Sequence, residues 1–210
     1  MSSRVAGPPT RDVLSRHGLP AGGERALPSS DRTFAGGGKF GVELSSINNA
    51  SILRTALALA KEHAIRVSRC DECRGIVRLP DADITEMVRI CAGEAVGLLL
   101  SVGPRAIYDT GGFVRSGNGK RVGYRLRGME SVVHAVDDVR RAVDLGVRGF
   151  IVYDEGLLML LAKLRQAGEL PANTVFKVSV HMGCANPLSA RVYEDLGADT
   201  LLHVIDAGNA

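Results

Sequence analysis

The chain contains no tryptophan, and aromatic residues make up only 4% of its 210 residues. Its formal net charge is only +3, and the arginines are spread along the whole chain. Proteins that bind single-stranded nucleic acid use a basic groove lined by aromatic rings. The composition therefore argues against nucleic acid as a partner.

Long hydrophobic runs are also missing. No apolar run approaches the roughly 20 residues that cross a bilayer, and no apolar signal core follows the N-terminus. We therefore expect no membrane partner and a cytoplasmic location, where the four cysteines stay reduced. Residues 1–35 are rich in glycine, proline, serine and arginine, which predicts a disordered leader. Residues 36–210 are expected to form a single domain.

The chain has few of the short motifs that indicate a metal site, a phosphate-binding loop or a catalytic nucleophile. Cys70 and Cys73 form a lone CxxC pair, whereas a structural zinc site needs four ligands, usually from two such pairs. The chain has no Walker phosphate loop, no GxGxxG turn after the first apolar run and no GxSxG nucleophile elbow. The sequence therefore assigns no cofactor and no metal. Metal or redox use of the cysteine pair is left as an open alternative.

What the chain does contain is a rhythm of short apolar runs separated by helix-length stretches. The runs are residues 40–44, 65–69, 97–102, 149–153, 175–180 and 200–204. This pattern is typical of strand–helix units and a parallel sheet. Because a closed eight-strand barrel takes about 250 residues, we predict an incomplete one. The predicted fold is α/β, a parallel (β/α) barrel of the TIM type with about six strand–helix units. An open parallel sheet is the alternative.

The run at residues 175–180 alternates between polar and apolar residues. Lys177, Ser179 and His181 share one face of the expected strand, opposite an apolar face. If the apolar face meets the helices, the polar face points into the barrel, as Glu43 of the first run also does. Ionisable groups in such a lumen have shifted pKa values, as acid–base chemistry requires. We predict Glu43, Lys177 and His181 as catalytic residues; a purely structural Lys177–Glu43 pair is the alternative.

Substrate-binding candidates follow the carboxyl ends of the runs, where parallel β/α folds place their ligands. The second run offers Ser68 and Cys70 to the inner face of the barrel, and a loop is expected from Cys70 to Pro80. The long irregular stretch at residues 103–128 is rich in glycine and arginine, which favours a lid over the site. The candidates are Arg105, Tyr108, Asp109, Tyr153, Asp154, Asn186 and His203.

A series of short motifs extends from Asp31 to Thr200. They are Asp31–Phe34, Phe40–Leu44, Val102–Ala106, Tyr108–Gly111, Asp137–Arg141, Asp144–Arg148, Ala167–Pro171, Lys177–Val180, Ala185–Pro187 and Asp195–Ala198. In these motifs the chain resembles bacterial proteins of the peptidase U32 family, the collagenase-like peptidases. The resemblance implies a barrel fold, and because those relatives are longer barrels, it implies a chain shortened at its C-terminal side. The family signature Glu-x-Phe-x-His-Gly-x-x-Cys is absent, so no catalytic residue is carried over.

Three functional hypotheses follow. The first is an enzyme that resembles these peptidases and hydrolyses a small or peptide-like substrate by acid–base chemistry at the carboxyl-end mouth of the barrel. The second is a truncated, non-catalytic barrel that serves as a binding or assembly subunit, because two open sheet edges favour a homo-oligomer. The third is a Schiff-base lyase that uses Lys177 as its amine nucleophile.

Overall fold

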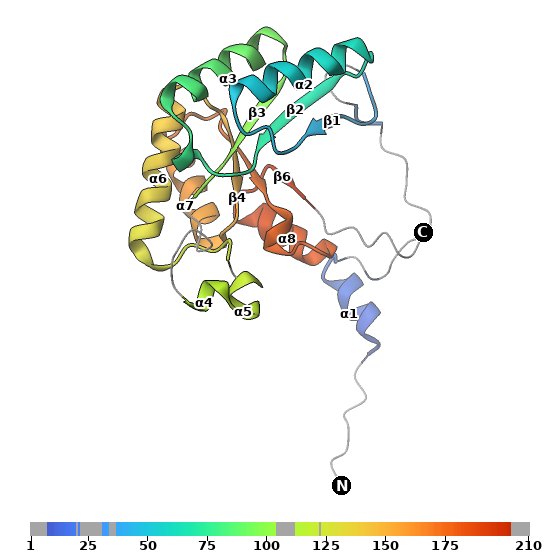
Figure 1. Cartoon of the computed structure of the whole chain (residues 1–210). Coiled ribbons are helices and arrows are strands. Elements are labelled where there is room, and N and C mark those ends of the chain that lie inside the picture. The colour runs from blue at the N-terminus through green and yellow to red at the C-terminus, as the bar shows by residue number, and fades with distance from the viewer. Residues whose placement is uncertain are drawn as a thin grey trace.

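The computed structural model describes residues 8–19, 21, 31–33, 37–103, 112–121 and 123–202. Its centre is one sheet whose six strands lie side by side in chain order (Figure 1). The strands are β1 (Val42–Leu44), β2 (Val67–Glu72), β3 (Gly97–Ser101), β4 (Gly149–Val152), β5 (Val175–Val178) and β6 (Thr200–Leu201). All neighbouring strands are parallel, which confirms the predicted α/β class.

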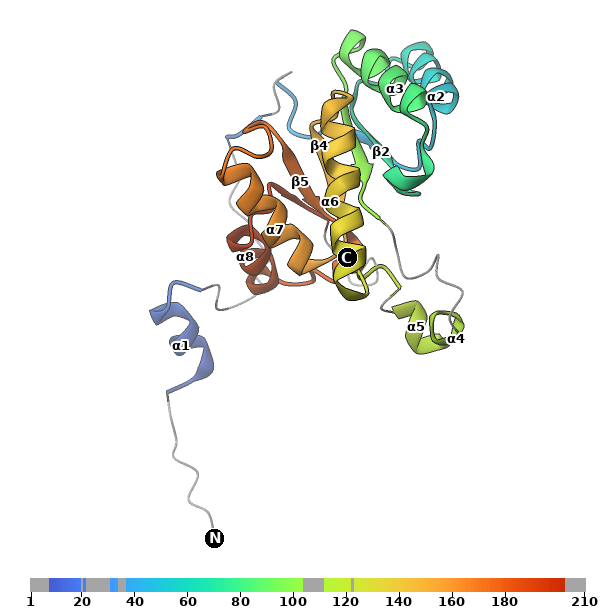
Figure 2. The same cartoon turned by 90° about the vertical axis from the view of Figure 1, so that its left-hand side faces the viewer.

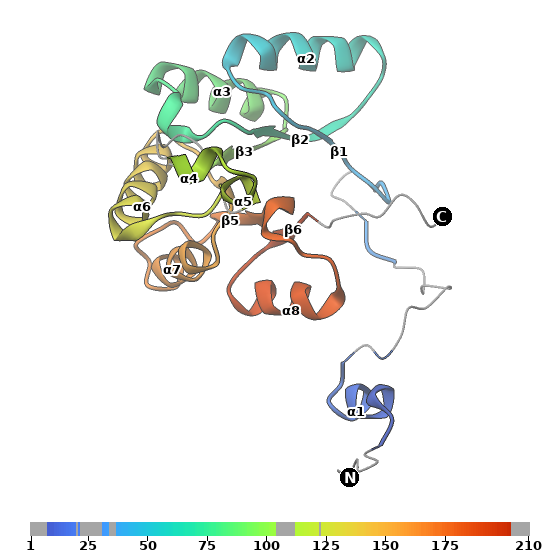
Figure 3. The same cartoon turned by 60° about the horizontal axis from the view of Figure 1, so that its bottom comes forward.

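Helices fill the crossover connections and cover the outer face of the sheet. The long helices are α2 (Ala50–Glu62), α3 (Asp81–Gly93), α6 (Gly128–Asp144), α7 (Glu155–Gln166) and α8 (Pro187–Asp195). Figure 3 shows them following one another in an arc around the strands. Two short helices, α4 (Gly112–Arg115) and α5 (Gly117–Arg121), lie between β3 and α6 and stand apart from the outer helices (Figure 2). Short 3₁₀ helices follow β2 and β5, at Ile76–Arg78 and Val180–Met182.

The sheet curls so that its first and fifth strands face each other across a lumen. Lys177 on β5 bonds to Glu43 on β1, although three strands separate them in the sheet. In the described ranges no strand joins β6 to β1, so the ring of strands stays open on one side. The structure therefore confirms an incomplete barrel of the TIM type with about six units and excludes the flat open sheet.

Apolar side chains form two layers, one on each face of the sheet. The larger layer lies between the strands and the outer helices, and its fully buried members include Leu53, Ile84, Met87, Phe150, Leu158, Leu161 and Phe176. Each such side chain contributes about 1.5–3 kcal/mol when buried, so this layer holds the helices on the sheet. The smaller layer lies inside the barrel, where Leu99, Ile151 and Tyr153 pack with Tyr124.

The second strand differs from its prediction in position and in facing. It runs from Val67 to Glu72, later than the expected residues 65–69, and it includes three residues that were expected to begin a loop. Ala64 adopts a positive φ of 54° in the turn after α2, and the strand begins at Val67. Cys70 is fully buried in the layer beneath the helices, so the prediction that Cys70 faces the lumen is wrong. Asp71 takes the inner position instead.

One further helix lies within the predicted leader at residues 1–35. Helix α1 (Thr10–Arg16) buries none of its residues and stands apart from the sheet (Figure 1). The division of the chain at residue 35 stays a prediction. None of the helices in the described part of the chain combines the length and the hydrophobicity that crossing a bilayer requires.

Candidate functional site

Four charged side chains from three strands meet inside the barrel. Lys177 Nζ donates to Asp71 Oδ2 over 2.6 Å and also bonds to Glu43 Oε1. Arg69 Nε pairs with the other oxygen of Glu43 at 2.8 Å. The side chains of Lys177 and Asp71 are 1% and 2% exposed, and that of Glu43 is 20% exposed. We call Glu43, Asp71 and Lys177 the lumen cluster.

Strand periodicity explains why these residues share the lumen. Successive side chains of a strand point to opposite faces, so Phe176 and Val178 enter the outer core while Lys177 points inward. The same rule places Arg69 and Asp71 on the face of β2 opposite the buried Cys70. The predicted proximity of Lys177 and Glu43 is observed. The sequence did not predict Asp71 as part of the site, because the expected strand ended at residue 69 and Asp71 fell in the expected loop.

Burial and shared hydrogen bonds set the protonation of the two carboxyl groups. Burial, together with a hydrogen bond to Glu43, raises the pKa of Asp71 from 3.8 to about 6, against the opposing pull of Lys177. Burial alone would raise the pKa of Glu43 as well, but hydrogen bonds from Asp71 and Lys177 lower it. Asp71 Oδ1 is buried and finds no hydrogen-bond donor among the described residues. The pair therefore holds one proton up to about pH 6, mainly on Asp71.

A hydroxyl pair lies nearer the carboxyl ends of the strands. Ser101 Oγ donates to the backbone oxygen of Glu72 over 2.6 Å and lies 2.9 Å from the hydroxyl of Tyr153. Because the Ser101 proton is used by that backbone oxygen, Tyr153 is the donor in the second bond. Ser101 is fully buried and Tyr153 is 6% exposed, so the pair is fixed inside the barrel.

Aromatic rings stack at the mouth of the barrel. The ring of His181 lies 3.8 Å from that of Tyr124, centroid to centroid, with only 8° between their planes. Tyr153 stacks on both, at 5.3 Å from Tyr124 and 6.2 Å from His181. Arg125 anchors the Tyr124 segment by binding the backbone oxygen of Tyr153 and, over 2.8 Å, the carboxylate of Glu155. Through Tyr124 and Tyr153, the stacked rings pack against the inner apolar layer.

His181 lies at this mouth because β5 ends earlier than expected. The strand stops at Val178, and Ser179 then caps a 3₁₀ helix whose middle residue is His181. His181 is exposed and stacks on Tyr124, whereas Lys177 lies buried in the lumen cluster. The prediction that both side chains continue one inward face of an uninterrupted strand is therefore wrong. The catalytic role of His181 stays a prediction.

Two predicted substrate-binding residues act as helix caps. Asp154 accepts a hydrogen bond from the backbone nitrogen of Leu126, in the segment before α6, and caps α7 by accepting another from the backbone nitrogen of Leu157. Asn186 accepts from the backbone nitrogens of Leu188 and Ser189 at the start of α8. Both caps satisfy nitrogens that a helix leaves unpaired in its first turn. A binding role for either residue stays a prediction.

The other predicted contacts fall outside the described residues. Arg105, Tyr108 and Asp109 belong to residues 104–111, and His203 belongs to residues 203–210. Their substrate-binding roles stay predictions, as does the lid at residues 103–128. Tyr153 is the candidate that the structure brings into the inner layer, together with Tyr124, which the sequence did not single out.

The cysteines do not form a reactive pair. None of the four cysteines is in a disulfide, and Cys70 and Cys73 occupy different surroundings, the first fully buried and the second half-buried. Burial raises the pKa of Cys70 to about 12, so its thiol stays protonated. Within the described ranges, no group of three or more histidine, cysteine or acidic side chains is placed to hold a metal ion.

Comparison with known proteins leaves the family open. Neither models of protein families nor curated proteins gave a match. Among solved structures, the U32 peptidase Mk0906 is similar with a TM-score of 0.48 and 18% identity, over 85% of this chain and 63% of that one. A 3-hexulose-6-phosphate synthase is similar with a TM-score of 0.36 and 14% identity, over 73% and 70% of the two chains. At these values neither likeness identifies a family, and the barrel assignment rests on the sheet itself.

Proposed function

We propose that the chain is an acid–base hydrolase that acts on a small or peptide-like substrate at the carboxyl-end mouth of its barrel. The observation that supports this proposal is the lumen cluster, in which Lys177 bridges two carboxyl groups of opposite pKa shift. Two titratable groups with divergent pKa values in one buried site are typical of an acid and its base. Their position below the carboxyl-end mouth of the barrel supports the proposal, because parallel β/α barrels bind their ligands at that end.

Each member of the cluster has a role in this proposal. Asp71 is the proton carrier, because a pKa of about 6 lets it both give and take a proton near neutral pH. Asp71 takes a proton from the water that attacks the acyl carbon of the substrate and returns it to the leaving group as the acyl bond breaks, while Glu43 stays ionised and Lys177 balances the charge of the two carboxylates. The hydroxyl of Tyr153 and the ring of His181 stand on the substrate side of the cluster. Hydrolysis then needs water and no cofactor.

Kinship with the U32 peptidases is part of the same proposal. Its support is the series of sequence motifs between Asp31 and Thr200, which includes Lys177–Val180 at the end of β5 and the start of the following 3₁₀ helix. A peptide substrate is proposed on this ground, and a cytoplasmic location is proposed from the reduced cysteines. A Schiff-base lyase receives no comparable support, because Lys177 Nζ is engaged by two carboxylates rather than left as an unpaired amine.

The test is digestion of gelatin and of a synthetic peptide mixture, read by mass spectrometry as new peptide termini. We expect the wild-type chain to produce them and Asp71→Asn to produce them at least tenfold more slowly, because asparagine cannot exchange a proton. Asp138→Asn is the matched control: burial raises the pKa of Asp138 too, but this residue lies on α6, outside the lumen. Digestion that is absent in wild type, or equal in Asp71→Asn, contradicts the proposal.

An assembly subunit remains the second candidate, because one observation favours it. Strands β1 and β6 form the two edges of the sheet in the described part of the chain, and unpaired edges promote association. If the chain is an assembly subunit, light scattering will give the mass of a homo-oligomer at micromolar concentration. A mass of 22.2 kDa, that of a single chain, would rule this candidate out.

A further inference from the structure

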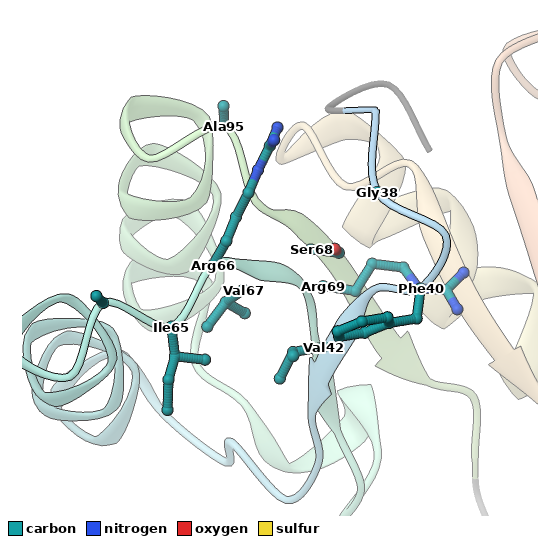
Figure 4. Close-up of a pocket in the computed structure, with 10 residues that line it drawn as sticks. Gly38, Phe40, Val42, Ile65, Arg66, Val67, Ser68, Arg69 and Ala95 are labelled. Atoms are coloured by element: carbon teal, nitrogen blue, oxygen red, sulfur yellow. The ribbon is translucent and has the colours of Figure 1, made fainter. Parts of the chain in front are cut away.

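A cleft of about 720 Å³ opens at the amino ends of β1 and β2, the end of the barrel opposite the mouth (Figure 4). Its volume falls within the roughly 300–1,000 Å³ of small-molecule sites. Side chains of Phe40, Val42, Ile65 and Val67 give it an apolar lining, and Arg66 and Arg69 add positive charge. An apolar cavity with a few charged groups is the usual composition of a ligand site.

Arg69 supplies the polar anchor of this cleft. Its Nε is used by Glu43 at 2.8 Å, which fixes the guanidinium plane, and its side chain is still 35% exposed. Figure 4 shows the guanidinium end beside Phe40, with its terminal nitrogens separate from the ring. Apart from Glu43, no described residue pairs with Arg69. Two parallel N–H groups of a held guanidinium match the two oxygens of a carboxylate.

The apolar wall of the cleft is unusually open to water. Phe40 is 80% exposed and Ile65 is 47% exposed, although both lie next to the partly buried Val42 and the buried Val67. Large apolar side chains that gather around a cavity at the surface mark an interaction site more often than isolated ones do. A ring or branched chain of a ligand would take these side chains out of water, while the arginines hold its charged end.

We propose that this cleft binds a small carboxylic acid with a hydrophobic body of about the size of a phenyl ring. The carboxylate pairs with the terminal nitrogens of Arg69, and the body packs on Phe40, Val42 and Ile65. This site goes beyond the proposed hydrolase and does not depend on it. Arg69 also forms an ion pair with Glu43, which belongs to the lumen cluster. A ligand bound to Arg69 is therefore connected to that cluster through this arginine.

The test is an NMR titration of the full chain with phenylacetate, followed by the backbone amide shifts of residues that line the cleft. We expect saturable binding that moves the signals of Phe40, Ile65 and Arg66. The uncharged phenylacetamide should bind at least tenfold more weakly, because it cannot form the charged pair with Arg69. Arg69→Met should weaken phenylacetate binding at least tenfold, while Arg89→Met, an exposed arginine on α3, should leave it unchanged.

A second variant guards against a folding defect in Arg69→Met, since that change also leaves Glu43 without its arginine. Phe40→Ala removes an 80% exposed ring and should weaken phenylacetate binding at least threefold with an unchanged unfolding transition. The proposal is overturned if phenylacetate and phenylacetamide bind alike, or if Phe40→Ala has no effect. It is also overturned if the cleft signals respond only to protein concentration, which would identify a protein interface. None of these measurements uses turnover, so their outcome neither supports nor contradicts the hydrolase proposal.

Discussion

Replacing Lys177 by methionine is expected to lower the free energy of unfolding by about 3–5 kcal/mol at pH 8. The substitution keeps an unbranched side chain, one atom shorter, but removes the ammonium that bridges Asp71 and Glu43. Two carboxyl groups would then face each other in a space where Asp71 is only 2% exposed. A buried charge without its partner is among the most destabilising changes in a protein. Urea denaturation followed by circular dichroism measures the loss.

Two further variants decide whether the lost ion pair is the cause. Lys163→Met removes an exposed lysine from α7 and should change stability by less than about 0.5 kcal/mol. Adding Asp71→Asn to Lys177→Met should restore part of the loss, because the neutral asparagine ends the repulsion from Glu43. If Lys177→Met unfolds at the same denaturant concentration as Lys163→Met, the lumen cluster does not hold the barrel together in solution.

The second large effect concerns pH. Because Asp71 keeps its proton in the folded state up to about pH 6, whereas its ordinary pKa is 3.8, the folded protein binds more protons than the unfolded one between these values. The contribution of Asp71 to the free energy of unfolding is therefore complete below about pH 3.8 and is lost as the pH rises through about 6. The difference between the two pKa values corresponds to about 3 kcal/mol. The pKa of Glu43 is lowered in the folded state, so the contribution of Glu43 to the free energy of unfolding increases as the pH rises.

Asparagine imitates the protonated form of Asp71 at every pH. Relative to wild type, Asp71→Asn should therefore gain stability steadily from about pH 4 to pH 7, by up to about 3 kcal/mol. Denaturant titrations at intervals of half a pH unit measure this difference directly. Asp137→Asn, an exposed carboxyl on α6, is the control for the loss of one negative charge. Curves for wild type and Asp71→Asn that stay parallel would show that Asp71 does not hold its proton.

Local patterns predicted the elements of this fold well. The apolar runs at residues 97–102, 149–153 and 175–180 contain β3, β4 and β5. Apolar runs are visible in a sequence because they depend on neighbours within a few residues. For the same reason the two-residue alternation of β5 was sufficient to place Lys177 on the inner face.

The candidate site was harder to predict, and the two errors have one physical origin. Asp71 and Glu72 look like a loop, yet both belong to a strand because distant groups satisfy them. Lys177 lies 106 residues away from Asp71, and Ser101, whose backbone nitrogen bonds to the carboxylate of Glu72, lies 29 residues away from it. His181 was taken for the end of a strand, but the chain had already turned into a 3₁₀ helix. Partners at such separations leave no periodic signal in the sequence.

By itself, the sequence determined the α/β alternation, the number of strand–helix units and the inward face of β5, since all three follow from the spacing of apolar residues. Only the tertiary structure decided that Asp71 completes the lumen cluster, that Tyr124 reaches the rings of His181 and Tyr153, and that Arg69 borders both lumen and cleft. Those contacts depend on the curl of the sheet, which brings β5 opposite β1 and is a property of all six strands together.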